Sequence, residues 1–95
     1  MRKLLLLLPL ILATPALAES DPFGLGEHAF KKYLLHFRNA SKFIELEDYE
    51  MGCSELRMAS TVLKTNFSLL QQYKPDFDWF KSRATVKGLI EGGCQ

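Results

Sequence analysis

The chain has 95 residues, with 12 Lys and Arg against 11 Asp and Glu, and a formal net charge of +1 at pH 7. Hydrophobic residues make up 47% of the chain and aromatic residues 12%, which suits one small globular domain and excludes a disordered chain. Basic residues nowhere cluster more densely than at Lys31-Lys32. The composition therefore predicts neither a nucleic acid nor an anionic membrane surface as the main partner.

The first 18 residues have the three parts of a signal peptide. Arg2 and Lys3 are basic, residues 4–13 are predominantly apolar, and Ala16-Leu17-Ala18 forms the small-x-small pattern that a signal peptidase accepts. We therefore expect cleavage before Glu19. The protein is then exported, to the periplasm or out of the cell.

An uncleaved membrane anchor is the alternative for this segment. Residues 4–18 are fewer than the roughly 20 apolar residues that a spanning helix needs, and no stop-transfer segment follows. A lipid anchor would need a cysteine where the chain has Glu19. No stable membrane anchor is predicted. Removal of the leader leaves 10 basic and 11 acidic residues, so the formal charge changes from +1 to −1.

Residues 19–26 contain Pro22, Gly24 and Gly26 without a periodic pattern, and are predicted to form a short extended lead-in. The acidic stretch over 45–50 marks a turn, with Asp48 as a candidate helix N-cap. Between these segments, residues 27–45 repeat apolar side chains at the spacing of an amphipathic helix, namely Phe30, Tyr33, Leu34, Phe37, Ala40 and Ile44.

A second helix is predicted over 48–74, and its two apolar stripes indicate neighbours on two sides, so it is the central helix. Pro75 ends it and begins a third helix over 76–91, which Gly92 and Gly93 terminate. The sequence thus predicts a single all-α domain over 27–95, folded as an antiparallel three-helix bundle. A short strand over 43–49 is the alternative for that segment.

The chain has two cysteines, Cys53 and Cys94. In an exported chain such a pair predicts a structural disulfide, and the lengths of the second and third helices bring Cys94 back level with Cys53. Pairing between two chains and a redox or metal-binding thiol pair are the alternatives. The second lacks the C-x-x-C spacing of thiol oxidoreductases and the paired knuckles of zinc sites. We expect a monomer clamped by one disulfide.

No pattern of catalytic, metal-binding or cofactor-binding residues is found. His28 and His36 are too far apart along one helix to share a metal and are interpreted as surface or boundary residues. The aromatic run Phe77, Trp79 and Phe80 has two interpretations, core packing or an exposed contact site for a partner. At helical spacing Phe77 and Phe80 share one face, whereas Trp79 points elsewhere, where Arg83 could stack on it.

Residues 36–64 contain Ala40, Phe43, Asp48-Tyr49, Gly52, Leu56 and Ala59 at the positions of small and aromatic residues in a helical hairpin. In this stretch, from His36 to Lys64, the chain resembles one degenerate tetratricopeptide repeat. His36, Asn39, Glu47 and Lys64 depart from that pattern. The resemblance implies a hairpin of the first two helices, and it implies no peptide binding because such repeats need about three copies to build a continuous core.

A second resemblance involves the ends of the second and third predicted helices. Asp48-Tyr49 with Gly52-Cys53, the run from Lys74 to Phe80 and the terminal Cys94 are similar to small exported proteins of cyanobacteria without an assigned role. It implies a periplasmic location or the thylakoid lumen, and no mechanism.

Three functions remain open from the sequence. The first is a non-enzymatic exported protein with a structural role or a protein partner. The second is a periplasmic stress, chaperone-like or inhibitor protein, whose aromatic core would become exposed in acid or on reduction. The third is a small-ligand carrier or an enzyme, which would require a pocket lined by polar groups.

Overall fold

The computed structural model describes residues 20–94, and the predicted signal peptide lies outside them. The described part of the chain has four helices and no strand: α2 (Leu25–Glu45), α3 (Tyr49–Thr65), α4 (Phe67–Tyr73) and α5 (Trp79–Gly93). The all-α class is therefore confirmed. The strand considered for 43–49 is wrong, because this segment is the end of α2, a turn and the start of α3.

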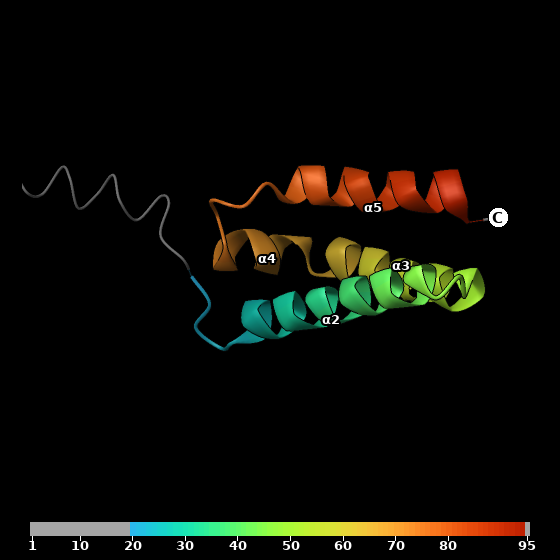
Figure 1. Cartoon of the computed structure of the whole chain (residues 1–95). Helices are drawn as coiled ribbons and strands as arrows, with labels where there is room; N and C mark the ends of the chain where they lie inside the picture. The colour runs from blue at the N-terminus through green and yellow to red at the C-terminus, as the bar shows by residue number, and fades with distance from the viewer. Residues whose placement is uncertain (1–19, 95) are drawn as a thin grey trace, which may run out of the picture.

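The helices alternate in direction along a common long axis (Figure 1). α2 runs from the end of the molecule where α4 lies to the α2–α3 turn, α3 and α4 return, and α5 runs back again. α3 packs against both α2 and α5, and the short α4 contacts α2, α3 and α5. Between them, α3 and α4 occupy the central position expected for one long helix.

The helix predicted over 48–74 is broken at Asn66. The backbone N–H and the side-chain amide of Asn66 both donate to the carbonyl of Val62, at 3.0 and 3.1 Å. Its backbone angles, φ −116° and ψ 21°, lie outside the helical range. An asparagine amide that competes for a backbone carbonyl in this way favours a helix end over a helix interior. α4 is thus a separate helix, which packs against α2.

Two other helix limits differ from the prediction because of aspartate side chains. The carboxylate of Asp21 accepts hydrogen bonds from the N–H groups of Gly26 and Glu27, at 2.7 and 3.0 Å, so α2 begins at Leu25 and not at residue 27. Asp78 caps α5 by accepting from the Lys81 N–H at 2.9 Å. The third helix therefore begins at Trp79, after a turn over 74–78, and not at residue 76.

Gly92 and Gly93 do not terminate α5, which includes both glycines and has Cys94 as its C-cap. The Cys94 N–H donates to the Ile90 carbonyl at 2.8 Å. The prediction that Asp48 is the N-cap of the second helix is confirmed, because its carboxylate accepts from the Met51 N–H at 3.3 Å.

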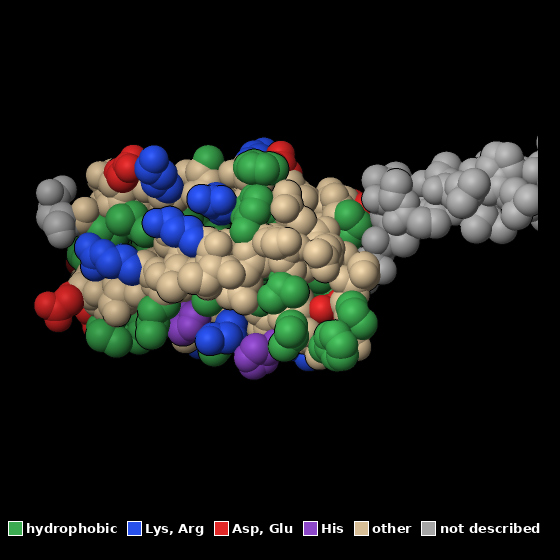
Figure 2. Space-filling view, turned by 180° about the vertical axis from the view of Figure 1, so that it is seen from behind, with side chains coloured by type: hydrophobic (Ala, Val, Ile, Leu, Met, Phe, Trp, Pro, Cys, Tyr) green, Lys and Arg blue, Asp and Glu red, His purple; other side chains and the backbone are tan. Residues whose placement is uncertain are grey.

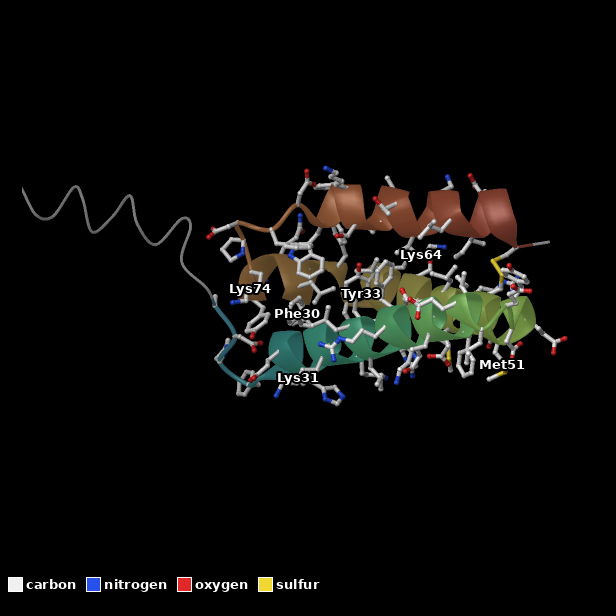
Figure 3. The ribbon with its side chains drawn as sticks, in the orientation of Figure 1. Phe30, Lys31, Tyr33, Met51, Lys64 and Lys74 are labelled. Atoms are coloured by element: carbon white, nitrogen blue, oxygen red, sulfur yellow. A yellow bond between two sulfur atoms is a disulfide. The ribbon has the colours of Figure 1, made fainter. Side chains whose placement is uncertain are left out.

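The core is an aromatic and aliphatic cluster centred on Trp79, which is 1% exposed. The indole ring meets Phe30 and Tyr33 of α2 edge to face, with centroids 5.8 and 6.1 Å apart, and its Nε1 donates to the Lys74 carbonyl at 3.0 Å. Figure 3 shows Phe30 and Tyr33 on the side of α2 that faces α4 and α5, with Lys31 on the opposite side. Burial raises the pKa of the Tyr33 hydroxyl, and a hydrogen bond with Ser82 partly offsets the rise.

Candidate functional site

The aromatic run that the sequence offered as a partner-contact site is divided by the fold. Trp79 is buried, and Arg83 does not stack on it but lies over the Phe67 ring, 4.8 Å from its centroid. Phe77 and Phe80 are 46% and 66% exposed. Each also packs on a neighbour, Phe77 on Trp79 and Phe80 on Phe67. Core packing therefore explains Trp79, and only the other two aromatic rings reach the surface.

The predicted disulfide is confirmed. Cys53 near the start of α3 is bonded to Cys94 at the end of α5, with Cα atoms 5.8 Å apart and a sequence separation of 41. Figure 3 shows the sulfur–sulfur bond joining these two helix ends, at the end of the molecule remote from Trp79. The bond joins the start of α3 to the end of α5, and these two segments and the end of α2 line one surface depression.

This depression, which we call the apolar groove, has a volume of about 360 Å³. Apolar side chains and the disulfide form most of it, and α5 contributes glycine backbone; the lining residues are Ile44, Tyr49, Cys53, Leu56, Gly88, Leu89, Gly92, Gly93 and Cys94. Large apolar groups here are open to solvent, with Tyr49 56% and Leu89 46% exposed. Leu46, at the tip of the neighbouring turn, is 75% exposed.

Carboxylates surround the turn beside the apolar groove. The segment 43–56 contains no Lys or Arg, and it carries four exposed acids close in sequence to the lining residues Ile44 and Tyr49, namely Glu45, Glu47, Asp48 and Glu50. We call these four residues the acidic rim. None of the four carboxylates forms an ion pair with a described residue. The Asp48 carboxylate accepts the N-cap hydrogen bond from the Met51 N–H.

Glu47 holds an unusual backbone conformation, with φ 61°. The Glu47 and Asp48 N–H groups donate to the carbonyls of Ile44 and Phe43 at 2.9 and 2.8 Å, which is the pattern of a Schellman helix end. Glycine is the usual residue at this left-handed position, because a side chain there is strained. The chain keeps a carboxylate at a position where glycine would be more stable.

The structure also brings together a pair that the sequence did not predict. His36 of α2 and Glu55 of α3 are in contact, with 2.8 Å between Nδ1 and Oε1, and their side chains are 16% and 14% exposed. Asn39 donates to the same carboxylate oxygen at 3.4 Å. His28 is exposed and takes no part. The pair joins α2 to α3, and it was hidden in the sequence because its members are 19 residues apart.

Within residues 20–94 no group of three or more His, Cys, Asp or Glu residues could hold a metal ion. In the same range no helix is long and apolar enough to cross a membrane. Comparison of the chain with protein-family models, with curated proteins and with solved structures finds no match. The resemblance of residues 36–64 to a tetratricopeptide hairpin, like that to small cyanobacterial proteins, therefore stays a prediction.

The apolar groove could not have been found from sequence periodicity. Its lining comes from three separated segments, and the disulfide that joins two of them, α3 and α5, also forms part of its wall. In the sequence the acidic rim is visible as a dense acidic stretch, which predicts a turn. Only the fold shows that this turn stands beside exposed apolar side chains.

Proposed function

We propose that this protein is an exported, non-enzymatic three-helix bundle that binds a protein partner through the apolar groove and the acidic rim. The observation that carries the proposal is their adjacency: exposed Tyr49 lines the groove together with Leu89, and in the sequence it lies between the rim carboxylates Asp48 and Glu50. The partner segment should present apolar side chains flanked by Lys or Arg.

The physical basis is burial at the centre and charge at the edge. Contiguous exposed apolar surface in a soluble protein often marks an interaction site. A partner side chain that enters the groove gains about 25 cal/mol for each Å² of apolar surface removed from water. Carboxylates at the edge accelerate encounter with a basic segment and disfavour acidic competitors.

Export is supported by two independent features. The leader has the basic, apolar and small-x-small parts of a signal peptide. The Cys53–Cys94 bond joins distant parts of the chain, and structural disulfides persist in oxidising compartments. N-terminal sequencing of the protein released by its producing cell should find Glu19 as the first residue. An intact Met1 on the released protein would contradict this assignment.

The binding proposal is tested by chemical cross-linking in the producing cell, followed by mass spectrometry. Leu89→Glu places a charge in the groove, and Glu45, Glu47 and Glu50 are changed together to Gln in a second variant. Phe80→Glu is the matched control, because Phe80 is also an exposed apolar residue on α5 but does not line the groove. We expect a cross-linked protein that the wild type and Phe80→Glu retain and that the other two variants lose.

The opposite pattern, loss with Phe80→Glu and retention with Leu89→Glu, would overturn the proposed site in favour of the Phe77 and Phe80 surface. A second copy of this chain is the other occupant to examine. Sedimentation equilibrium of the wild type and Leu89→Glu tests this alternative. If the wild type forms dimers and Leu89→Glu does not, the apolar groove binds a second copy of the chain and not a basic partner.

A further inference from the structure

The opposite flank of α5 forms a second groove, with α3 as its other wall. It has a volume of about 350 Å³, and α3 contributes Ser60 and Lys64. α5 contributes Arg83, Lys87 and Glu91, together with the apolar surface of Ala84 and Ile90. We call it the basic groove. None of its lining residues lines the apolar groove, so the two surfaces are separate.

Three cations and one carboxylate meet in the basic groove. Lys64 makes no ion pair with a described residue. Lys87 reaches Glu91 at 3.8 Å, but these side chains are 73% and 65% exposed, so the pair is weak. The Arg83 guanidinium rests on the Phe67 ring, which fixes its position without neutralising its charge. The groove therefore carries an excess of positive charge although the whole chain is nearly neutral.

This concentration of charge is a product of the fold. Lys64 is remote in sequence from Arg83 and Lys87, and the return of the chain along α5 brings them to one groove. Figure 3 places Lys64 in the space between α3 and α5. In the space-filling view of Figure 2, Lys and Arg side chains gather on one face of the molecule, with acidic side chains mainly at its edges.

We infer that the basic groove binds a small organic anion, with a phosphate or carboxylate group held by Lys64, Arg83 and Lys87. The Ser60 hydroxyl supplies a further hydrogen-bond donor. An apolar part of the ligand packs against Ala84 and Ile90. A bound anion relieves the repulsion among three like charges, and hydrogen bonds between ionised groups are the stronger kind. This site does not depend on the proposed protein partner, which uses the other flank of α5.

The test is a nuclear magnetic resonance titration of the oxidised protein, expressed as the full chain and labelled with ¹⁵N. Phenyl phosphate, phenylacetate and inorganic phosphate are the anionic probes, and benzyl alcohol is the neutral probe of similar shape. We expect saturable shifts confined to the amides around residues 60–64 and 83–91 with the aromatic anions, weaker binding of inorganic phosphate and none of benzyl alcohol. The stronger of phenyl phosphate and phenylacetate identifies the preferred anionic group.

Lys64→Gln is the decisive variant, because Lys64 is exposed and its removal leaves the core intact. Loss of a charged hydrogen-bond donor should weaken binding by about 10-fold or more. Lys31→Gln is the control: Lys31 is also an exposed lysine, but it lies on α2, paired with Glu27 at 3.3 Å and outside the basic groove. It should bind as the wild type does.

Three results would overturn the inference. The first is shifts that stay linear through the titration, and the second is equal weakening by Lys31→Gln and Lys64→Gln. The third is sedimentation with phosphatidylglycerol vesicles in the absence of any binding of phenyl phosphate, which would assign the groove to a membrane surface. None of these results bears on the Leu89→Glu experiment, so the two proposals fail separately.

Discussion

The two ends of the helical domain are held together by different means. At the end where α4 lies, Trp79 is sealed between Phe30, Tyr33 and the Lys74 carbonyl. At the other end the large side chains Tyr49 and Leu89 stay exposed, and the Cys53–Cys94 bond holds the helices. A covalent bond secures an end without burying its apolar surface, which leaves that surface free to contact another molecule.

The glycines of α2 and α5 show the same contrast. A Cβ atom at Gly26 would lie 2.6 Å from the Tyr73 Cβ and 2.8 Å from the Leu69 carbonyl oxygen, so α2 and α4 touch there. At Gly88 and Gly92 a Cβ atom would meet nothing within 4 Å. Gly26 is therefore required for packing within the chain, and Gly88 and Gly92 are not. Gly52 of α3, beside the disulfide, is also close-packed, because a Cβ atom there would lie 2.8 Å from the Ile44 Cγ1.

The largest effect is expected from Trp79→Ala. Truncation of a buried Trp leaves a cavity and should cost about 3–5 kcal/mol of unfolding free energy. Phe80→Ala, which truncates a 66% exposed ring one residue away, is the control and should cost far less. Urea unfolding followed by circular dichroism measures both with the disulfide intact. Similar losses in the two variants would mean that the Trp79 end is not the tightly packed one.

Replacement of Cys53 and Cys94 by alanine should cost about 2–4 kcal/mol, because the unfolded chain regains the freedom that the cross-link removes. The loss of stability should be greatest near the removed disulfide. Amide hydrogen exchange should accelerate more around residues 49–53 and 88–93 than around Trp79. A uniform acceleration would contradict the division of the domain into a packed end and a clamped end.

Substitution of glycine by alanine should have opposite effects on stability at Gly26 and Gly88. Gly26→Ala forces α2 away from α4 and should destabilise the fold by about 1–3 kcal/mol, the usual cost of overpacking. Gly88→Ala lies in a helix with open space around it and should stabilise by about 0.5–1 kcal/mol. Thermal unfolding of the two variants gives the comparison directly. A destabilised Gly88→Ala would show that α5 has no open space around Gly88.

Glu47→Gly should have a smaller, stabilising effect of up to about 1 kcal/mol, since it relieves the left-handed conformation at the end of α2. It should also weaken retention of the proposed partner, because the acidic rim loses a carboxylate. Glu47→Gln separates the two causes, as it removes the charge and keeps the strain. If Glu47→Gly is no more stable than Glu47→Gln, the strain at this position is negligible.

The helices could be predicted from the sequence because apolar spacing and capping residues are local patterns. The disulfide could be predicted because two cysteines allow only one pairing within the chain. Apolar spacing marks α2, and the Asp48 cap marks the start of α3. The break at Asn66 was missed because both halves continue the same apolar stripes, whereas the break depends on one amide bonding to the Val62 carbonyl. The start of α5 was placed too early because Pro75 and Asp76 fit a first helical turn as well as the observed loop.

The sequence by itself determined the helical class, the approximate helix limits and the pairing of Cys53 with Cys94. Only the tertiary structure decided that Trp79 is core, that His36 meets Glu55, and that the two flanks of α5 carry an apolar groove and a basic groove. Periodicity reports which face of a helix is apolar or charged. Which residues pack opposite that face depends on how helices distant in the sequence pack against one another.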